Sequence, residues 1–279
     1  MVLKWKYSFQ IGIELLKIQP LLQLKAIDFA FPGETLLLRG MDLTVDRGEF
    51  VTLLGPSGCG KSTIMNIAAG LLTASAGRVT FDGKPLVGIN RDVGYMTQGD
   101  TNLPWLTVAK NVLLPLELRG TPAAERRKKL AQVLELVNLT DRANYYPSAL
   151  SGGMKRRALL ARSLIYNPPM LLMDEPFAAL DAQLRETMHK ELRATVNRLQ
   201  ESVLFVTHDI AEAVLLSDRV LVLAGRPLRV LAEVRPPFGK ERDLDAIRVA
   251  AEFARMEAEL RQTLRQGSPA RAGVEGTAA

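Results

Sequence analysis

The sequence contains one cysteine and two histidines in 279 residues. A single thiol cannot form a disulfide within the chain, so we expect a fold held by its hydrophobic core in a reducing compartment. Zinc sites in proteins usually need three or four cysteine, histidine or carboxylate ligands, and most classes built on cysteine and histidine are therefore excluded.

Long apolar segments are also missing. The longest stretch without a charged residue, Ser62–Gly77, is rich in small residues and is shorter than the about 18 apolar residues that a membrane-spanning helix needs. Charges interrupt the apolar part of the N-terminal segment, and no small-residue cleavage site follows, so we expect no signal peptide. These absences predict a cytosolic chain in which residues 1–21 form an N-terminal extension.

The charge balance is modest. Lys and Arg number 36 against 30 for Asp and Glu, which gives a net charge of +6. An excess of this size is typical of a solvated surface, and we expect no nucleic-acid partner. Hydrophobic residues make up 47% of the chain, which is ordinary globular composition and excludes global disorder.

Short apolar runs recur along the chain, at Phe50–Leu54, Met170–Met173, Val203–Val206 and Val220–Leu223. Runs this short, apolar on both faces and bounded by turn residues, are typical of central strands in a sheet covered by helices. A helical apolar stripe lies between two of the runs and comprises Leu184, Met188, Leu192 and Leu199. Strands that alternate with helices predict an α/β layered fold.

Two other segments have helical patterns without buried-strand signals. Ala123–Asn138 has helical periodicity, and we interpret the surrounding region, from about Gly99 to Leu150, as a helical subdomain inserted into the α/β core. Near the C-terminus, apolar residues recur at helical spacing at Phe253, Met256, Leu260 and Leu264. They predict one amphipathic helix followed by a disordered tail.

The segment Gly55–Ser62 reads G-P-S-G-C-G-K-S and matches the pattern of phosphate-binding loops, G-x-x-x-x-G-K-[ST]. It follows an apolar run and precedes a helix-compatible stretch. Glycines let consecutive backbone N–H groups surround phosphate oxygens, and the helix N-terminus adds partial positive charge. The residues expected at a nucleoside triphosphate are Gly55, Pro56, Ser57, Gly58, Cys59, Gly60, Lys61, Ser62 and Thr63.

Three of these side chains have expected roles. Lys61 can reach the β- and γ-phosphates, and the Ser62 hydroxyl can bind Mg²⁺. Thr63 could donate to the α-phosphate. The Cys59 side chain should point away from the phosphates, because the backbone of the loop forms the phosphate cradle.

Two carboxylates, Asp174 and Glu175, end the apolar run Met170–Met173. The carboxyl ends of strands in a parallel sheet meet the ligand. We therefore expect Asp174 to hold Mg²⁺ through water and Glu175 to polarise the attacking water. Such a pair can also cap the next helix, but the phosphate loop favours the functional interpretation.

The segment Leu150–Met154 reads L-S-G-G-M and precedes a basic helix start. Serine and glycines that open a helix form a second anion-binding nest. The chain thus has two phosphate-directed helix N-termini but only one loop with the lysine. This imbalance favours a nucleotide shared between two chains.

With these motifs in order, the sequence resembles the ATPase subunits of ATP-binding cassette (ABC) transporters over about Leu22–Gly225. The resemblance implies that Gln98 is the Q-loop glutamine, a ligand of Mg²⁺ and water that also senses the transmembrane partner. Ser151, Gly152 and Gly153 match the signature loop, and Ala179–Asp181 matches the D-loop. Asp174 and Glu175 match the Walker B aspartate and the catalytic glutamate.

Two further residues are assigned by resemblance. His208 matches the switch histidine that contacts the γ-phosphate, whereas His189 matches no motif and is expected on a helix surface. Phe31 lies where the family places an aromatic ring that stacks on adenine, with Phe29 as the competing candidate. Met154 replaces the commoner glutamine, as in importers of the nitrate, sulfonate and taurine type, which the segment 98–120 also resembles.

The resemblance implies an α/β fold, a P-loop NTPase (RecA-like) core with an inserted α-helical subdomain and an N-terminal antiparallel β-subdomain. The ABC ATPase domain would span residues 22–235. Residues 22–98 and 157–235 would form the core with its β-subdomain, and residues 99–156 the helical subdomain. Residues 236–279 would hold the C-terminal helix and tail.

The implied function is the ATP-hydrolysing subunit of an importer at the cytoplasmic face of the cell membrane. Two copies would enclose two ATP molecules with Mg²⁺ and would act on separate permease subunits through the Gln98–Trp105 surface. A periplasmic or lipoprotein solute-binding protein would be an indirect partner. The alternatives are the motor of an exporter or lipid-moving complex and a soluble cassette that acts on ribosomes or DNA.

Overall fold

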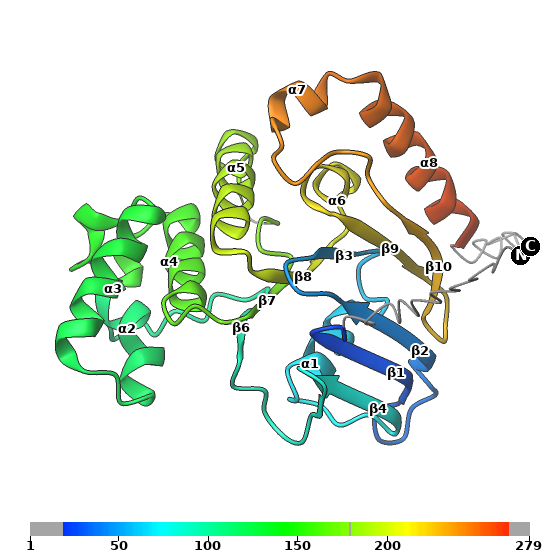
Figure 1. Cartoon of the computed structure of the whole chain (residues 1–279), viewed down its shortest axis with the longest axis horizontal. Helices are drawn as coiled ribbons and strands as arrows, with labels where there is room; N and C mark the ends of the chain where they lie inside the picture. Colours follow the sequence, from blue (N-terminus) through cyan, green and yellow to red (C-terminus); the bar gives the residue numbers. More distant parts are fainter. Residues whose placement is uncertain (1–18, 179, 268–279) are drawn as a thin grey trace, which may run out of the picture.

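The computed structural model describes residues 19–178 and 180–267. Most of the predicted N-terminal extension, Ala179 of the predicted D-loop and the tail from residue 268 lie outside the described residues. The described chain forms two sheets, with one group of helices beyond the β6 edge of the larger sheet (Figure 1).

The larger sheet has six strands in the order β10-β9-β3-β8-β7-β6. All neighbours are parallel except β10, which pairs antiparallel with β9 at one edge. Every residue of β3, β7, β8 and β9 is buried, so the four apolar runs predicted as central strands are confirmed. The bounds are β3 (Phe50–Leu54), β6 (Val93–Met96), β7 (Met170–Asp174), β8 (Ser202–Thr207), β9 (Arg219–Ala224) and β10 (Arg229–Val234).

The smaller sheet is antiparallel where its strands pair, in the order β2-β1-β4-β5. Its strands β1 and β2 alternate between buried and more exposed residues, as expected for a sheet with one face on a core. This is the predicted N-terminal antiparallel β-subdomain. The bounds are β1 (Leu22–Phe29), β2 (Leu38–Val45), β4 (Ala76–Phe81) and β5 (Lys84–Pro85).

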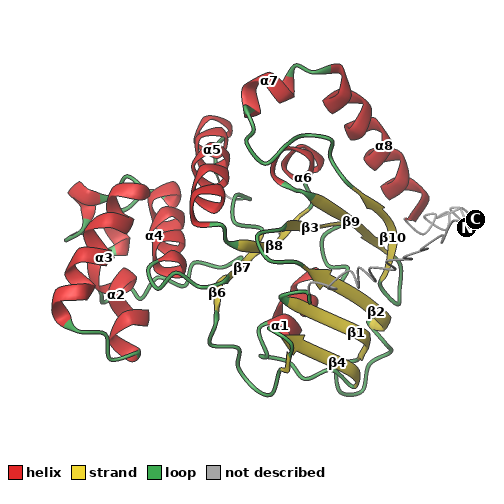
Figure 2. Cartoon of the chain, viewed as in Figure 1, coloured by secondary structure: helices red, strands yellow, loops and turns green. Residues whose placement is uncertain are grey.

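Helices α2 (Val108–Leu118), α3 (Ala123–Leu136) and α4 (Gly152–Leu164) gather on one side of the molecule with no strand between them (Figure 2). Short 3₁₀ turns at Thr140–Arg142 and Pro147–Ala149 lead into α4. These helices correspond to the predicted helical subdomain. The expected boundary after residue 156 falls inside α4, which continues unbroken to Leu164.

A buried asparagine fixes the entry to this helical group. Asn111 is fully buried. Its Oδ1 accepts from the backbone N–H of Leu103 at 2.7 Å, and its Nδ2 donates to the carbonyl oxygens of Leu103 and Leu106, each at 3.0 Å. The 103–106 segment belongs to no helix or strand, and the Asn111 side chain provides hydrogen bonds for its backbone groups. The segment can therefore pack closely against α2.

The remaining helices are α1 (Lys61–Ala68), α5 (Ala182–Leu199), α6 (Ile210–Leu216), α7 (Leu244–Arg248) and α8 (Ala251–Gly267). The predicted C-terminal amphipathic helix is α8: Phe253, Met256 and Leu260 are buried, and α8 packs against α6 and β9.

The expectation of a helix-surface position for His189 is wrong, because His189 is only 2% exposed. The apolar stripe lies on α5, with Leu199 at its last residue and 39% exposed. His189 is buried because Glu212 of α6 lies 3.3 Å from its Nε2. A polar partner on the neighbouring helix thus lowers the cost of burying the imidazole.

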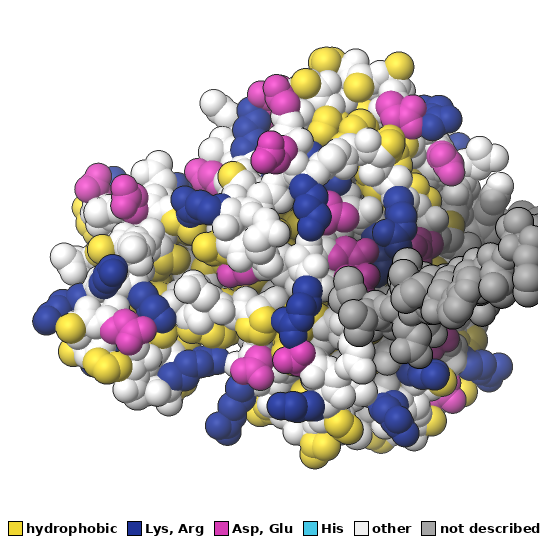
Figure 3. Space-filling model, in the orientation of Figure 1, with side chains coloured by type: hydrophobic (Ala, Val, Ile, Leu, Met, Phe, Trp, Pro, Cys, Tyr) yellow, Lys and Arg dark blue, Asp and Glu magenta, His cyan; other side chains and the backbone are white. Residues whose placement is uncertain are grey.

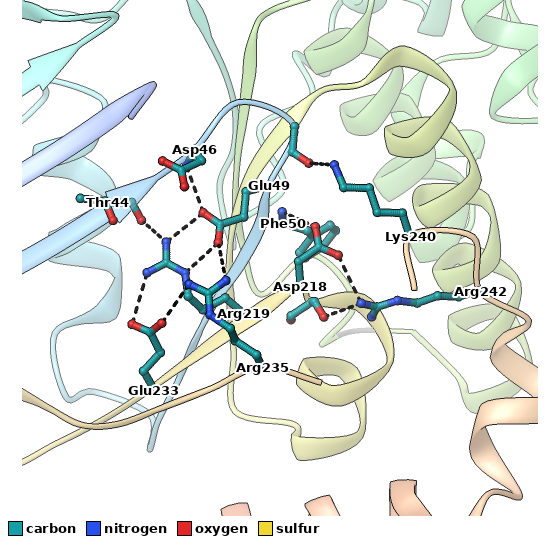
Figure 4. A network of polar contacts seen from close by, with 12 residues as sticks. Thr44, Asp46, Glu49, Phe50, Asp218, Arg219, Glu233, Arg235, Lys240 and Arg242 are labelled. Carbon is teal, nitrogen blue, oxygen red and sulfur yellow. Dashed lines mark hydrogen bonds and ion pairs between the residues drawn. The ribbon is translucent and has the colours of Figure 1, made fainter. Parts of the chain in front are cut away.

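An ionic network joins the amino ends of β3 and β9, at the edge opposite the phosphate loop (Figure 4). Arg219 donates to both carboxylate oxygens of Glu49, at 2.8 and 2.9 Å. Arg242, which follows β10, reaches Asp218 at 3.2 Å and the carbonyl oxygen of Ser217 at 2.8 Å. Burial, together with the nearby Arg193, lowers the pKa of Arg242 to about 10. The network fastens the segment after β10 to the core.

On the face in Figure 3, basic and acidic side chains are interspersed without one dominant basic patch. Mixed charges of this kind are typical of a solvated surface.

Glu201, between α5 and β8, has a buried carboxyl group. It is 4% exposed, and neither carboxyl oxygen has a partner among residues 19–178 and 180–267. Burial raises the pKa of Glu201 to about 8. Between the ordinary glutamate pKa and this value, the folded chain binds a proton that the unfolded chain releases. Stability should therefore fall as pH rises through this interval and level off above it.

We predict that Glu201→Gln removes this pH dependence. Because glutamine stays neutral, the variant should gain stability relative to the wild type as pH rises from 5.5 to 8.5, by at most about 4 kcal/mol. Urea unfolding at the two pH values measures the difference. Glu241→Gln, at an exposed position, is the control. Equal pH slopes in wild type and Glu201→Gln would contradict the prediction.

Candidate active site

The phosphate loop connects β3 to α1 at the carboxyl edge of the larger sheet. A Cβ on Gly55 would lie 2.6 Å from the carbonyl oxygen of Leu223, so a side chain does not fit there. Gly58 and Gly60 have φ angles of 75° and 113°, in the region that favours glycine. The glycines of the motif are thus required by the path of the backbone.

Lys61 is held at this loop although it is only 4% exposed. Its ammonium group donates to the carbonyl oxygens of Gly55, at 2.8 Å, and Pro56, at 2.7 Å. These contacts satisfy a buried cation and keep its charge beside the backbone that would surround a phosphate.

Asp174 and Glu175 lie at the end of β7. Asp174 is 4% exposed; burial raises its pKa, an effect that a hydrogen bond from Ser62 opposes. Glu175 has a φ of 46°, and its backbone N–H donates to the carbonyl oxygen of Val206 at 3.0 Å. A non-glycine residue in this left-handed conformation stores strain, which is common where a side chain must face a site.

Two residues from separate elements converge on Glu175. Gln98, after β6, donates through Nε2 to Glu175 Oε2 at 3.3 Å. His208, after β8, places Nδ1 at 3.3 Å from the same oxygen, and its side chain is 52% exposed. The structure therefore brings together three residues that the sequence analysis assigned to hydrolysis, although more than 70 positions separate Gln98 from Glu175.

A cavity of about 370 Å³ opens between the phosphate loop, Gln98 and the smaller sheet. Phe31 lines it and is 38% exposed, whereas Phe29 is 5% exposed. The two rings pack edge-to-face, with their centroids 5.0 Å apart. Of the two candidate rings, Phe31 is the one that a ligand in the cavity could contact. The described lining residues are Phe31, Glu34, Leu37, Ser57, Gly58, Gly60, Lys61, Ser62, Thr63, Gln98, Glu175 and Arg226.

The signature and D-loop residues are not among the described residues that line this cavity. Ser151 caps α4 by accepting from the backbone N–H of Met154 at 3.3 Å, and Asp181 caps α5 by accepting from that of Leu184 at 2.9 Å. A Cβ on Gly153 would lie 1.9 Å from Leu184 Cδ2. The two helix starts therefore pack on each other, while Ser151 and Gly152 remain exposed.

Cys59 also faces away from the cavity. It is 8% exposed and lines a second hollow on the other side of the phosphate loop. This position agrees with the expectation that its side chain points away from the phosphates.

A buried network around His208 was missed by the sequence analysis. Glu212 of α6 accepts from the Thr207 hydroxyl at 2.6 Å and lies beside His189. The Thr207 hydroxyl in turn accepts from the backbone N–H of Asp209 at 3.0 Å. These contacts hold the chain on both sides of His208. The only sequence signal was a glutamate four positions after the histidine, which by itself is ordinary helix composition.

No described helix is long and apolar enough to cross a membrane.

Comparisons with known proteins agree with this geometry. The sequence model of the ABC transporter family matches residues 38–178. The chain is 43% identical over 202 residues to the nitrate import ATP-binding protein NrtD of Synechocystis sp., covering 72% of this chain and 76% of that protein. It is 42% identical over 221 residues to the taurine import ATP-binding protein TauB of Pseudomonas putida, covering 79% and 84%.

Solved structures give the same result. The dimeric structure of MJ0796, a bacterial ABC transporter cassette, has a TM-score of 0.70 at 32% identity and covers 78% of this chain and 100% of its own. CbiO1 from Clostridium perfringens, part of the cbiONQ complex, has a TM-score of 0.72 at 27% identity and covers 87% and 99%. The predicted resemblance to nitrate- and taurine-type cassettes is confirmed, and the chain belongs to the ABC transporter family as an ATP-binding, ATP-hydrolysing subunit.

Proposed function

We propose that this ATPase is the motor of an importer for a small solute of the nitrate, sulfonate or taurine kind, working on separate permease subunits. The observation that carries the hydrolytic part is the convergence of Gln98 and His208 on Glu175 beside the phosphate loop. The importer part rests on the relatives named for nitrate and taurine import. The solute would be delivered by a binding protein outside the membrane.

In the proposed complex, ATP occupies the cavity with its adenine against Phe31 and its phosphates in the loop of residues 55–63. Lys61 would exchange its two carbonyl contacts for phosphate oxygens, and Thr63 would contact the α-phosphate. Such charge-assisted contacts are stronger than the neutral ones they replace.

The donor set fits Mg²⁺. Asp174, Ser62 and Gln98 offer carboxylate, hydroxyl and amide oxygens, which are the hard ligands that this cation prefers. Burial raises the pKa of Asp174, and a cation beside it would favour the ionised carboxylate. When bound, the metal would neutralise charge on the phosphates.

Glu175 is the proposed general base. It faces the cavity and can orient a water for attack on the γ-phosphate, while Gln98 and His208 hold its carboxylate through Oε2. His208 is half exposed, so its ring can also reach the γ-phosphate of a bound nucleotide.

The signature loop is proposed to serve ATP held by a second copy. Ser151 and Gly152 are exposed and do not line the described wall of this chain's own cavity. Their helix N-terminus offers N–H groups for an anion, and Asp181 lies at the adjacent start of α5. A partner's nucleotide would complete this surface, giving a homodimer with two shared ATP molecules.

The permease is proposed to dock near Gln98, at the inner face of the membrane. A hollow of about 660 Å³ lies between β6, α2 and α4, with Leu118 at its rim. Leu118 is 80% exposed and Trp105 is 70% exposed. Arg156 of α4 donates to the carbonyl oxygens of Thr97 at 3.0 Å and of Gln98. A permease that moves the helical group would therefore also move the backbone at Gln98.

Three predictions test this function, and the first of them addresses hydrolysis and the shared nucleotide together. Glu175→Gln should bind ATP but lower turnover by about 100-fold or more, because an amide cannot act as the base. It should sediment as a monomer without nucleotide and as a dimer with ATP and Mg²⁺. Adding Ser151→Arg should abolish the dimer and leave ATP binding intact, since the arginine would block only the partner's site.

Ser75→Arg is the control for the added bulk and charge, because Ser75 is an exposed serine directly before β4 of the smaller sheet. Wild-type turnover in Glu175→Gln would remove the role given to Glu175. Dimers that persist with Ser151→Arg, or loss of ATP binding in that variant, would refute the shared site.

The second prediction concerns the network beside His208. Thr207→Val keeps the side-chain shape but removes the hydroxyl that joins Glu212 to Asp209. We expect kcat to fall about tenfold with KM for ATP nearly unchanged, because Thr207 does not line the cavity. Thr187→Val, at an exposed threonine of α5, should match the wild type. An unchanged kcat, or a change confined to KM, would argue against the positioning role.

The third prediction concerns docking. Leu118→Glu should release the chain from membranes of cells that contain its permease, because a charge would be buried at the contact. Its ATPase activity when purified alone should stay near the wild-type value. Val249→Glu, 86% exposed between α7 and α8, controls for the charge. Full retention of Leu118→Glu on membranes would disprove this docking surface, and absence of the wild type from membranes would favour a soluble cassette.

A further inference from the structure

A hollow with a volume of about 970 Å³ lies on the outer side of the phosphate loop. Its walls are the loop residues 56–59, the turn between β9 and β10, the start of β2 and the C-terminal end of α8. In Figure 1 these elements meet where the end of α8 lies beside β10. We name this hollow the arginine cleft, after its lining residues Arg39, Arg226 and Arg229.

The three guanidinium groups have no acidic partner among the described residues. No Asp or Glu lines the described walls of the cleft, and none of the three arginines takes part in the ion pairs of the described chain. Nearby arginines behave differently: Arg219 pairs with Glu49, and Arg235 with Glu233. Arginines near the cleft thus have acidic partners, whereas the three arginines that line it have none among the described residues.

Two of the arginines are neighbours by strand pairing. Leu38 and Leu228 form an isolated parallel bridge, and the backbone N–H of Leu228 donates to the carbonyl oxygen of Leu37 at 2.7 Å. Arg39 and Arg229 follow the bridged residues directly, and both line the cleft. Like charges at adjacent positions of paired strands destabilise the fold, unless an anion lies between them.

Arg229 runs beside the turn before β10. Gly225 in that turn has a φ of 96°, and a Cβ there would lie 3.8 Å from both Cγ and Nε of Arg229, an ordinary contact distance. The arginine side chain therefore passes next to this glycine. Thr263 and Gln266 of α8 and Ser57 of the loop add neutral polar groups to the same hollow.

We propose that the arginine cleft binds a small soluble anion with two or more negatively charged oxygens, of the phosphate, sulfate or carboxylate class. Guanidinium groups bind such oxygens in pairs. Ser57, Gly58 and Arg226 line both this cleft and the nucleotide cavity. An anion in the cleft would therefore contact the outer face of the loop whose inner face holds ATP.

The test uses the wild-type chain saturated with a non-hydrolysable ATP analogue, so that the γ-phosphate position of the nucleotide cavity is filled as well. Inorganic pyrophosphate is titrated by calorimetry at constant ionic strength. We expect one bound anion per chain, and at least tenfold weaker binding in Arg39→Gln/Arg229→Gln. The control, Arg78→Gln/Lys84→Gln, removes two exposed charges of the smaller sheet outside the cleft and should bind like the wild type.

A second measurement locates the anion. Cys59 lines the cleft but not the nucleotide cavity, so pyrophosphate should slow its alkylation by iodoacetamide in the chain saturated with the ATP analogue. No calorimetric binding, or equal binding in both double variants, would overturn the proposal. Binding only to phosphatidylglycerol vesicles would overturn the assignment to a soluble anion. Neither readout involves hydrolysis, so failure here leaves the proposed motor function untouched.

Discussion

The parallel register of β3, β8 and β7 is the constraint on which the active site depends. Leu54 pairs with Thr207, and Asp174 pairs with Val206. The chain leaves these strands at nearly the same level, so the phosphate loop, Glu175 and His208 emerge side by side. A slip of two residues in one strand would move a functional group by about 6–7 Å, further than any hydrogen bond at Glu175 could span.

The active site combines several features that each lower the stability of a fold: a buried cation, a desolvated carboxyl group and a strained backbone conformation. Lys61 is buried, Asp174 is desolvated, and Glu175 adopts a left-handed backbone conformation. Such departures from local preference persist only where the surrounding fold enforces them. Here the fully buried strands on either side supply that rigidity, and the N–H of Glu175 is fixed to Val206.

Local signals predicted the central strands, the phosphate loop and Glu175: a short apolar run, a glycine loop, a carboxylate after a strand. Gln98 and His208 carry no such signal, and only the resemblance to ABC ATPases placed them among the functional residues. Local signals failed where packing between distant helices decides, since His189 is buried because α5 meets α6 at Glu212. The pairing that sets Arg39 beside Arg229 likewise needs the bridge between Leu38 and Leu228, which no periodicity encodes.

Arg156 explains how an inserted helical group can influence chemistry that it does not perform. Its guanidinium binds the backbone carbonyls around Gln98, and Gln98 contacts Glu175. Burial lowers the pKa of Arg156, so breaking these contacts would strand a poorly solvated cation. The helical group and Glu175 should therefore move together, because separating them would cost the free energy of leaving Arg156 without its carbonyl partners. On the opposite flank, Ser57 and Gly58 of the phosphate loop line both the nucleotide cavity and the arginine cleft, so an anion bound in one hollow would contact the wall of the other.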